Sequence, residues 1–137
     1  MASTLCVDKR WAEGLKLFNK KEYFECHDVI ETLWLRTPKG DRHRDLYKGV
    51  IQAAAAIYQW DRGVHSGAEG LYKSSLNYLK DYGPRALGLD VSAMIREMKK
   101  CFGDFPEKRE LTPHLEFNSK RFTITPHEHS RKLGKST

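Results

Sequence analysis

Apolar positions recur at helical spacing along most of the first hundred residues. Trp11, Leu15 and Phe18 lie three or four residues apart, which predicts a first helix. Two longer apolar stretches predict helices over about 22–36 and 43–62, the second rich in alanine, the best helix former. The segment between them contains a proline and a glycine, which break helices.

Capping signals predict two further helices. Ser66 and Glu69 have the spacing of a capping box, so a fourth helix is expected to begin at Ser66 and to run to about Tyr82. Asp90 has the character of an N-cap, and Gly103 of a helix end, which predicts a fifth helix between them. No alternating strand pattern occurs before Gly103.

Short connections between successive helices make neighbouring helices antiparallel. We therefore expect an all-α antiparallel bundle of about five helices over residues 1–103, followed by a basic, largely irregular tail over residues 104–137. Within that tail, residues 115–124 have some extended character, but no partner strand is predicted for them. The small residues Gly49, Ala53 and Ala54 allow the third helix to approach its neighbours closely.

Composition predicts one globular domain without a membrane partner. The chain has 137 residues, of which 39% are hydrophobic and 31% charged. Its longest apolar stretch, Val50–Tyr58, is far shorter than the ~20 residues that span a bilayer. The N-terminus shows no secretory signal, and Cys6, Cys26 and Cys101 form no Cys-x-x-Cys pair, so we expect reduced thiols and a cytoplasmic location. Wide apolar faces would suit a monomer or a homodimer.

The formal net charge is +6, and much of it lies at the end of the chain. Residues 118–137 contain five basic side chains and one acidic side chain, Glu128. Such a tail can be an electrostatic arm for the phosphates of nucleic acid. It can equally be a solvated end, and with Phe122 as the sole aromatic residue among these basic side chains the second interpretation is favoured.

Polar residues interrupt the apolar face of the second helix. On a helical wheel, His27 and Glu31 fall in the middle of the broad apolar arc, Asp28 at its edge, and Glu25 away from its centre. We therefore expect an imidazole and a carboxylate to face the interior together. Burial of such groups is costly unless they are paired, which points to a specific role for the pair.

Three roles are compatible with this spacing. The commonest is an interior His27–Glu31 pair whose polar groups are hydrogen-bonded and which links two helices. The second is a metal site, with zinc or manganese held by His27, Asp28 and Glu31, although the strong His-Glu-x-x-His signal is absent. The third is a pocket in which the pair binds a ligand or handles protons. No cofactor other than this divalent metal is predicted.

The third helix supplies partners for a pocket between the second and third helices. Tyr47 and Tyr58 can bury their rings and offer hydroxyl groups to the pair. Arg62 ends the third helix, where the helix dipole favours a cation, and it would lie near the mouth of the pocket. Gln52 falls on the opposite side of the wheel and is expected to be exposed or to meet another element. The predicted pocket residues are His27, Glu31, Tyr58 and Arg62.

Several short blocks resemble the domain-of-unknown-function family numbered 309, over roughly residues 11–102. They are Tyr23–Glu31 with Trp34, Tyr47-x-Gly49-Val50-Ile51-Gln52-x-Ala54, Arg62-Gly63, Gly67-Ala68 and Gly88-Leu89-Asp90. The resemblance implies a small helical bundle, and some members are labelled predicted metal-dependent hydrolases. The family's polar block falls on Glu25, His27, Asp28 and Glu31. Its other motif residues fall on Trp34, Tyr47, Gln52 and Gly63. Gln59 and Val64 depart from the family, which often has histidine and asparagine there.

The leading hypothesis from the sequence is a small helical module that binds a small molecule or a protein partner through the His/Glu pocket. The alternative is a metal-dependent hydrolase, in which a metal-bound water would attack the substrate. Nucleic-acid association through the basic tail is a weaker third hypothesis. Whether the protein is an enzyme stays open at this stage.

Overall fold

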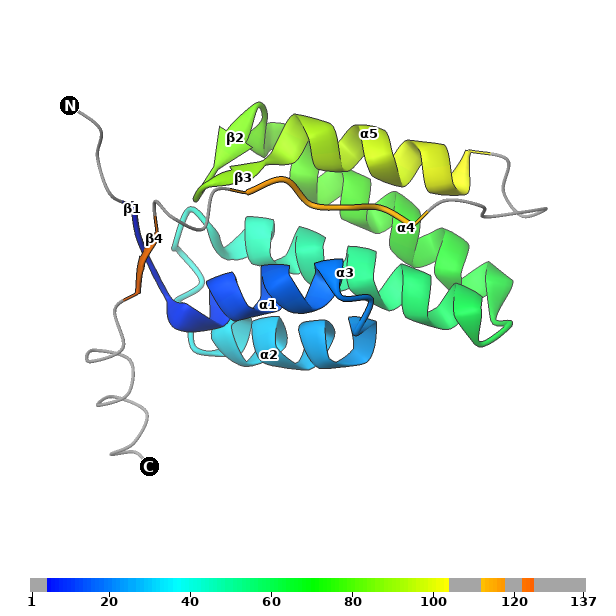
Figure 1. The fold of residues 1–137 in the computed structure, drawn as a ribbon, viewed down its shortest axis with the longest axis horizontal. Helices are drawn as coiled ribbons and strands as arrows, with labels where there is room; N and C mark the ends of the chain where they lie inside the picture. Colours follow the sequence, from blue (N-terminus) through cyan, green and yellow to red (C-terminus); the bar gives the residue numbers. More distant parts are fainter. Residues whose placement is uncertain (1–4, 104–111, 118–121, 125–137) are drawn as a thin grey trace.

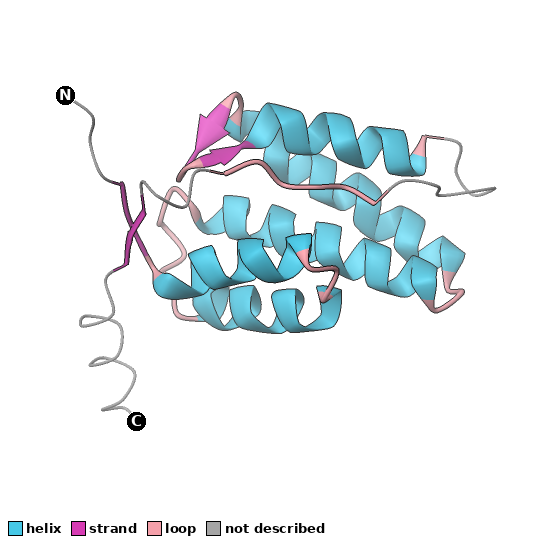
Figure 2. Ribbon diagram, viewed as in Figure 1, coloured by secondary structure: helices cyan, strands magenta, loops and turns pink. Residues whose placement is uncertain are grey.

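The computed structural model describes residues 5–103, 112–117 and 122–124, and its body is an all-α bundle (Figure 1). Each of the five predicted helices is present, with ends that differ from the prediction by a few residues. Helices account for most of the ribbon, and the few strands lie at the periphery (Figure 2). The helices are α1 (Lys9–Asn19), α2 (Tyr23–Leu35), α3 (Arg44–Asp61), α4 (His65–Leu79) and α5 (Val91–Phe102), with a short 3-10 turn, η1 (Lys80–Tyr82), after α4. None of these described helices is long and apolar enough to cross a membrane.

Helix α3 is the centre of the bundle, because it packs against both α2 and α4. The expectation that small residues let α3 approach its neighbours is confirmed. A Cβ atom on Gly49 would lie 2.6 Å from Cδ2 of Leu79 on α4. The Ser75 hydroxyl on α4 also donates a buried hydrogen bond of 2.7 Å to the Gly49 carbonyl. Ala53 and Ala54 are fully buried.

One of the two predicted helix caps is confirmed and the other is wrong. Asp90 caps α5, since its Oδ1 accepts a hydrogen bond of 2.9 Å from the Ala93 amide. Helix α4, however, begins at His65, one residue before the predicted Ser66, and its N-cap Val64 provides no side-chain hydrogen bond. The His65 ring stacks on Trp60 with centroids 4.1 Å apart, and this contact joins the start of α4 to the end of α3.

Short strands lie beside the bundle. β2 (Arg85–Ala86) and β3 (Leu89–Asp90) form an antiparallel hairpin, whose turn has positive φ at Leu87 and Gly88. β1 (Leu5–Val7) and β4 (Phe122–Ile124) pair in parallel. The alternation of strand residues does not predict these strands, because two or three residues are too few to establish a period.

The C-terminal segment 112–117 packs on the bundle, within the stretch that the sequence predicts to be largely irregular. We call this segment the strap; in Figure 1 it passes between α5 and α1 and ends beside β3. Leu115 is 1% exposed. Its carbonyl accepts a hydrogen bond of 2.9 Å from the Asn19 amide group, and its own N–H donates to Asn19 Oδ1 at 2.7 Å. The strap is held because the apolar side chain of Leu115 is buried in the core and Asn19 hydrogen-bonds to both the N–H and the carbonyl of Leu115.

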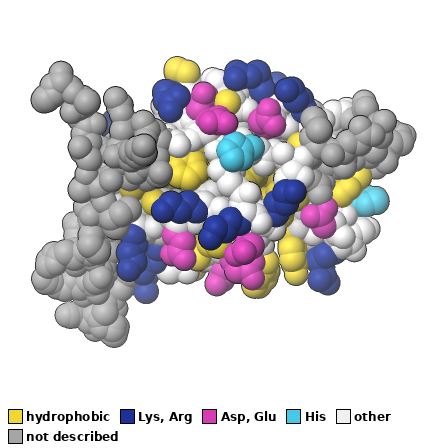
Figure 3. Space-filling view, viewed as in Figure 1, with side chains coloured by type: hydrophobic (Ala, Val, Ile, Leu, Met, Phe, Trp, Pro, Cys, Tyr) yellow, Lys and Arg dark blue, Asp and Glu magenta, His cyan; other side chains and the backbone are white. Residues whose placement is uncertain are grey.

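The basic residues on which the nucleic-acid hypothesis depends lie outside the described residues: Lys120, Arg121, Arg131, Lys132 and Lys135. That hypothesis therefore stays a prediction from the sequence. On the face of the bundle seen in Figure 3, basic and acidic side chains are intermixed.

Two of the cysteines are buried free thiols, as the sequence predicts. Cys26 and Cys101 are 0% and 1% exposed. Burial raises the pKa of the Cys26 thiol well above its usual range, because the charged thiolate would be desolvated. This thiol is therefore an inert part of the core.

Candidate functional site

The His27–Glu31 pair lies at the edge of the bundle, and the prediction that it faces the interior is wrong. The side chains of His27 and Glu31 are 31% and 38% exposed, and Nδ1 and Oε1 are 3.8 Å apart. The buried face of α2 consists instead of Tyr23, Cys26, Ile30 and Leu33. The wheel placed the arc wrongly because it counted Phe24 and Leu35 as core residues, whereas they are 53% and 66% exposed.

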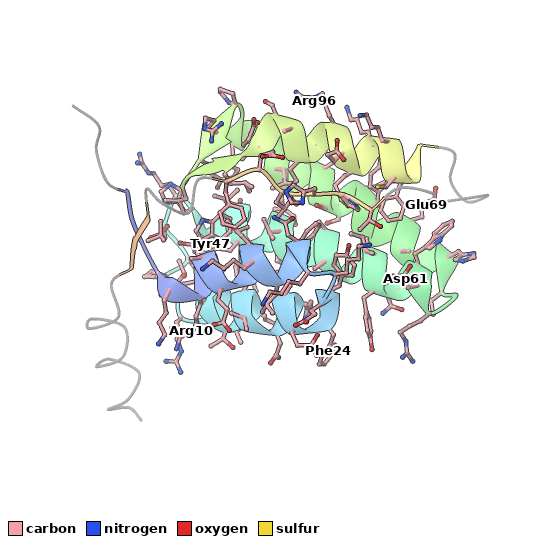
Figure 4. All side chains as sticks on the ribbon, viewed as in Figure 1. Arg10, Phe24, Tyr47, Asp61, Glu69 and Arg96 are labelled. Carbon is pink, nitrogen blue, oxygen red and sulfur yellow. The ribbon has the colours of Figure 1, made fainter. Side chains whose placement is uncertain are left out.

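The half-buried imidazole nevertheless forms part of a pocket between α2 and α3. This α2–α3 pocket has a volume of about 150 Å³ and is lined by Phe24, His27, Ala55, Tyr58 and Gln59. The rings of Phe24 and Tyr58 face each other at a tilt of 43°, with centroids 5.5 Å apart. Phe24 projects from the outer side of α2, toward the end of the bundle where Asp61 lies (Figure 4). The structure thus brings together His27 and Tyr58, two of the four predicted pocket residues.

The other two predicted residues, Glu31 and Arg62, flank the α2–α3 pocket and do not line it. Glu31 lies beside His27, one turn further along α2. On the α3 side, Arg62 donates from Nη1 to the Tyr58 hydroxyl at 3.4 Å, and its Cζ lies 5.3 Å from the centre of the Tyr58 ring. The pocket therefore has an acidic group beyond one wall and a basic group beyond the other.

The predicted metal ligands do not form a complete set. Zinc sites in proteins use at least three protein ligands. His27 and Glu31 are neighbours, but Asp28 is exposed on the next position of the helix. Within residues 5–103, 112–117 and 122–124, no three His, Cys, Asp or Glu side chains are grouped closely enough to hold an ion. The residues present therefore do not fit the divalent metal that the hydrolase alternative requires.

Three motif residues lie away from the pocket. Glu25 is exposed, as predicted. Tyr47 packs against Trp11 with ring centroids 5.4 Å apart, so its hydroxyl is not offered to the pair. Burial, followed by the charges of Asp41 and Asp8, raises the pKa of Tyr47 to about 12. Gly63 has a φ of +84°, and it follows α3 because glycine adopts this conformation without strain.

Two motif residues lie further along the α2–α3 contact. Gln52 was expected to be exposed or to meet another element. Its Oε1 is buried and has no hydrogen-bond partner in the described part of the chain. The second alternative fits, because α3 packs against both α2 and α4. The ring of Trp34 is half-buried and lies close to the charged ends of Arg44 and Lys48 on α3.

Sequence reasoning missed Phe24, Ala55 and Gln59 as pocket residues. Phe24 was assigned to the core because it is apolar. A usable signal existed, since Phe24 and His27 are three residues apart on α2, and Ala55 and Tyr58 are three residues apart on α3. Such pairs share a face of their helix. Only the register between the two helices, which a single sequence does not give, shows that these faces meet.

A family model matches the part of the chain that contains this site. Residues 11–71 match the model of the family named domain of unknown function (DUF309). The match covers most of α1, all of α2 and α3 and the first part of α4, and it confirms the resemblance inferred from the sequence. It also includes each residue that lines the α2–α3 pocket.

A bacterial protein is similar to part of the chain. The uncharacterized protein YpuF of Bacillus subtilis (strain 168) is 32% identical over 84 residues, which is 60% of this chain and 48% of the relative. The chain thus spans about half the length of this curated relative. The relative is itself uncharacterised, so the similarity adds no activity.

Because the His27–Glu31 pair is half-exposed, we expect it to contribute little to stability. Glu31→Gln should change the free energy of unfolding by less than about 0.5 kcal/mol, since solvent screens an exposed ion pair. Urea denaturation followed by circular dichroism measures this directly. A loss above about 2 kcal/mol would instead indicate a buried pair whose imidazole lost its partner.

Proposed function

We propose that the protein is a small-molecule binding module whose α2–α3 pocket takes a planar, aromatic group. The observation that supports the proposal is the convergence of the Phe24 and Tyr58 rings on one half-open cavity. A volume of about 150 Å³ suits a single six-membered ring; an engineered apolar cavity of about this size binds benzene. Aromatic walls favour such a ring through offset or edge-to-face contacts.

The polar groups around the pocket favour a ligand that carries a negative charge. His27 and Gln59 supply hydrogen-bonding groups in the wall. Glu31 lies on the Nδ1 side of His27, so the other ring nitrogen is left for a ligand. Arg62, beside Tyr58, can pair with a carboxylate or phosphate through its planar guanidinium group. An aromatic acid combines these features.

The proposal is tested by filling the pocket. Ala55 is a half-buried wall residue, so Ala55→Leu should occupy the cavity without removing a polar group. A library of small aromatic carboxylates, screened by thermal shift against the full chain, should contain compounds that stabilise the wild type. We expect Ala55→Leu to weaken their binding by at least about tenfold, or about 1.4 kcal/mol.

Tyr58→Phe is the matched variant, because it keeps the ring and removes only the hydroxyl that Arg62 contacts. It should retain most of the affinity, since the ring contact is preserved. If the library contains no stabilising compound, or if every stabilising compound acts equally on Ala55→Leu, the α2–α3 pocket is not the binding site.

A further inference from the structure

We propose that Trp34, Arg44 and Lys48 form a second binding site, which takes the doubly charged phosphate group of a small molecule. The proposal does not depend on the function proposed for the α2–α3 pocket. Lys48 and the pocket residue Ala55 are seven positions apart on α3, or about 10 Å along the helix axis. The two sites therefore lie on different parts of the surface.

Two positive charges converge on one aromatic ring at this site. Cζ of Arg44 lies 4.2 Å from the centre of the Trp34 ring, and Nζ of Lys48 lies 4.1 Å from it. Each distance is well inside the range of a cation–π contact. The ring thus holds two long, normally mobile side chains in place, and such order reduces the entropy that a ligand must overcome.

Neither cation has an acidic partner among the described residues. Arg44 and Lys48 are four residues apart on one helix face, a spacing at which like charges repel. Arg44 donates from Nε to the Thr37 carbonyl at 3.1 Å, which fixes its side chain but leaves its charge unneutralised. In the ranges that the structure describes, no carboxylate lies within ion-pair distance of either side chain. Both residues are half-buried, so water screens them less than it screens fully exposed cations.

The indole group adds a third donor without an acceptor. Nε1 of Trp34 is buried, and no described residue accepts a hydrogen bond from it. Buried polar groups in native proteins nearly always have partners, so a donor without a partner among the described residues is suited to an acceptor on a ligand. A cluster of two cations and one unsatisfied N–H has donors but no acceptors, and its natural complement is an anion.

The number of charges indicates which anion. A phosphate monoester carries close to two negative charges at neutral pH and offers three acceptor oxygens. The phosphodiesters of nucleic acids carry one charge per phosphate and have fewer free oxygens. Two cations held at one ring match the monoester best, with the guanidinium group of Arg44 able to bind two oxygens at once. The ligand class is therefore a small phosphomonoester or free phosphate.

Nuclear magnetic resonance of the full chain tests this site with inorganic phosphate as the probe. The Trp34 indole N–H resonance, assigned from Trp34→Phe, should shift saturably as phosphate is added at about pH 8, where the dianion dominates. The Trp11 indole N–H, which donates to the Leu87 carbonyl at 2.9 Å, serves as the internal reference and should not move. Lys48→Gln should weaken phosphate binding by at least about tenfold.

The matched control is Lys73→Gln, since Lys73 is an exposed lysine on another helix, α4, and already pairs with Glu69. It should bind phosphate as the wild type does. Dimethyl phosphate, with a single charge, should bind at least about tenfold more weakly than phosphate. The site is disproved if sodium chloride at equal ionic strength gives the same shift, or if Lys48→Gln binds phosphate as well as Lys73→Gln. Equal binding of dimethyl phosphate would contradict the assignment to a dianion.

Discussion

Leu115→Ala is expected to lower the free energy of unfolding by about 2–4 kcal/mol, the usual cost of deleting a buried leucine side chain. Leu115 is 1% exposed, although it lies in a segment whose composition predicts an irregular tail. Its methyl groups fill the core, and its backbone is satisfied on both sides by Asn19. Loss of the side chain would leave a cavity and weaken the attachment of the strap to α1.

Leu35→Ala is the matched control for this prediction. Leu35 is also a leucine, but it is 66% exposed at the end of α2, so its truncation should change stability by less than about 0.5 kcal/mol. Chemical denaturation of the two variants, followed by circular dichroism, gives both values. Equal stabilities of the two variants would show that the strap is not part of the folded unit.

Gly14→Leu is expected to destabilise the protein by about 3 kcal/mol or more, because it forces α1 away from α2. A Cβ atom at position 14 would lie 2.3 Å from Cγ1 of Ile30 and 2.4 Å from its Cδ1. Ile30 is fully buried, so its side chain has no space into which it can move. The gain in helix propensity over glycine, below about 1 kcal/mol, is too small to offset the overlap.

The same substitution at Gly70 on α4 should change the stability in the opposite direction. Among the described residues, no atom beyond its chain neighbours and the local helix backbone lies within 4 Å of a Cβ built there. Gly70→Leu should therefore stabilise the protein by up to about 1 kcal/mol through helix propensity alone. Thermal unfolding of the pair tests the close contact between α1 and α2. A neutral Gly14→Leu would contradict that contact.

The helices could be predicted from the sequence because each one carries a local signal. Alanine content and apolar spacing indicate α3, and the Asp90 side chain caps α5 as predicted. Ser66 misled the prediction, because a capping sequence marks the start of a helix only where the helix has not already begun. Helix α4 begins one residue earlier, at His65, which stacks on Trp60. Local rules therefore gave the element types and missed details that tertiary contacts decide.

The strap and the site could not be predicted in the same way, because both depend on contacts between distant segments. Asn19 and Leu115 are 96 residues apart, and nothing in either segment indicates the other. The helical wheel of α2 singled out His27 and Glu31 as polar residues on an apolar face. It predicted that they face the interior, because Phe24 was counted as a core residue. The pairing of Trp34 with Arg44 and Lys48 likewise follows from the register between α2 and α3.

The most direct test of the central claim, that the α2–α3 pocket binds an aromatic acid, is chemical-shift mapping of the full chain with benzoate. The account predicts saturable shifts of the backbone amides around Phe24 and His27 on α2 and around Ala55 and Tyr58 on α3, with the rest of the spectrum unchanged. No shift at millimolar benzoate, or saturable shifts elsewhere in the bundle, would contradict it.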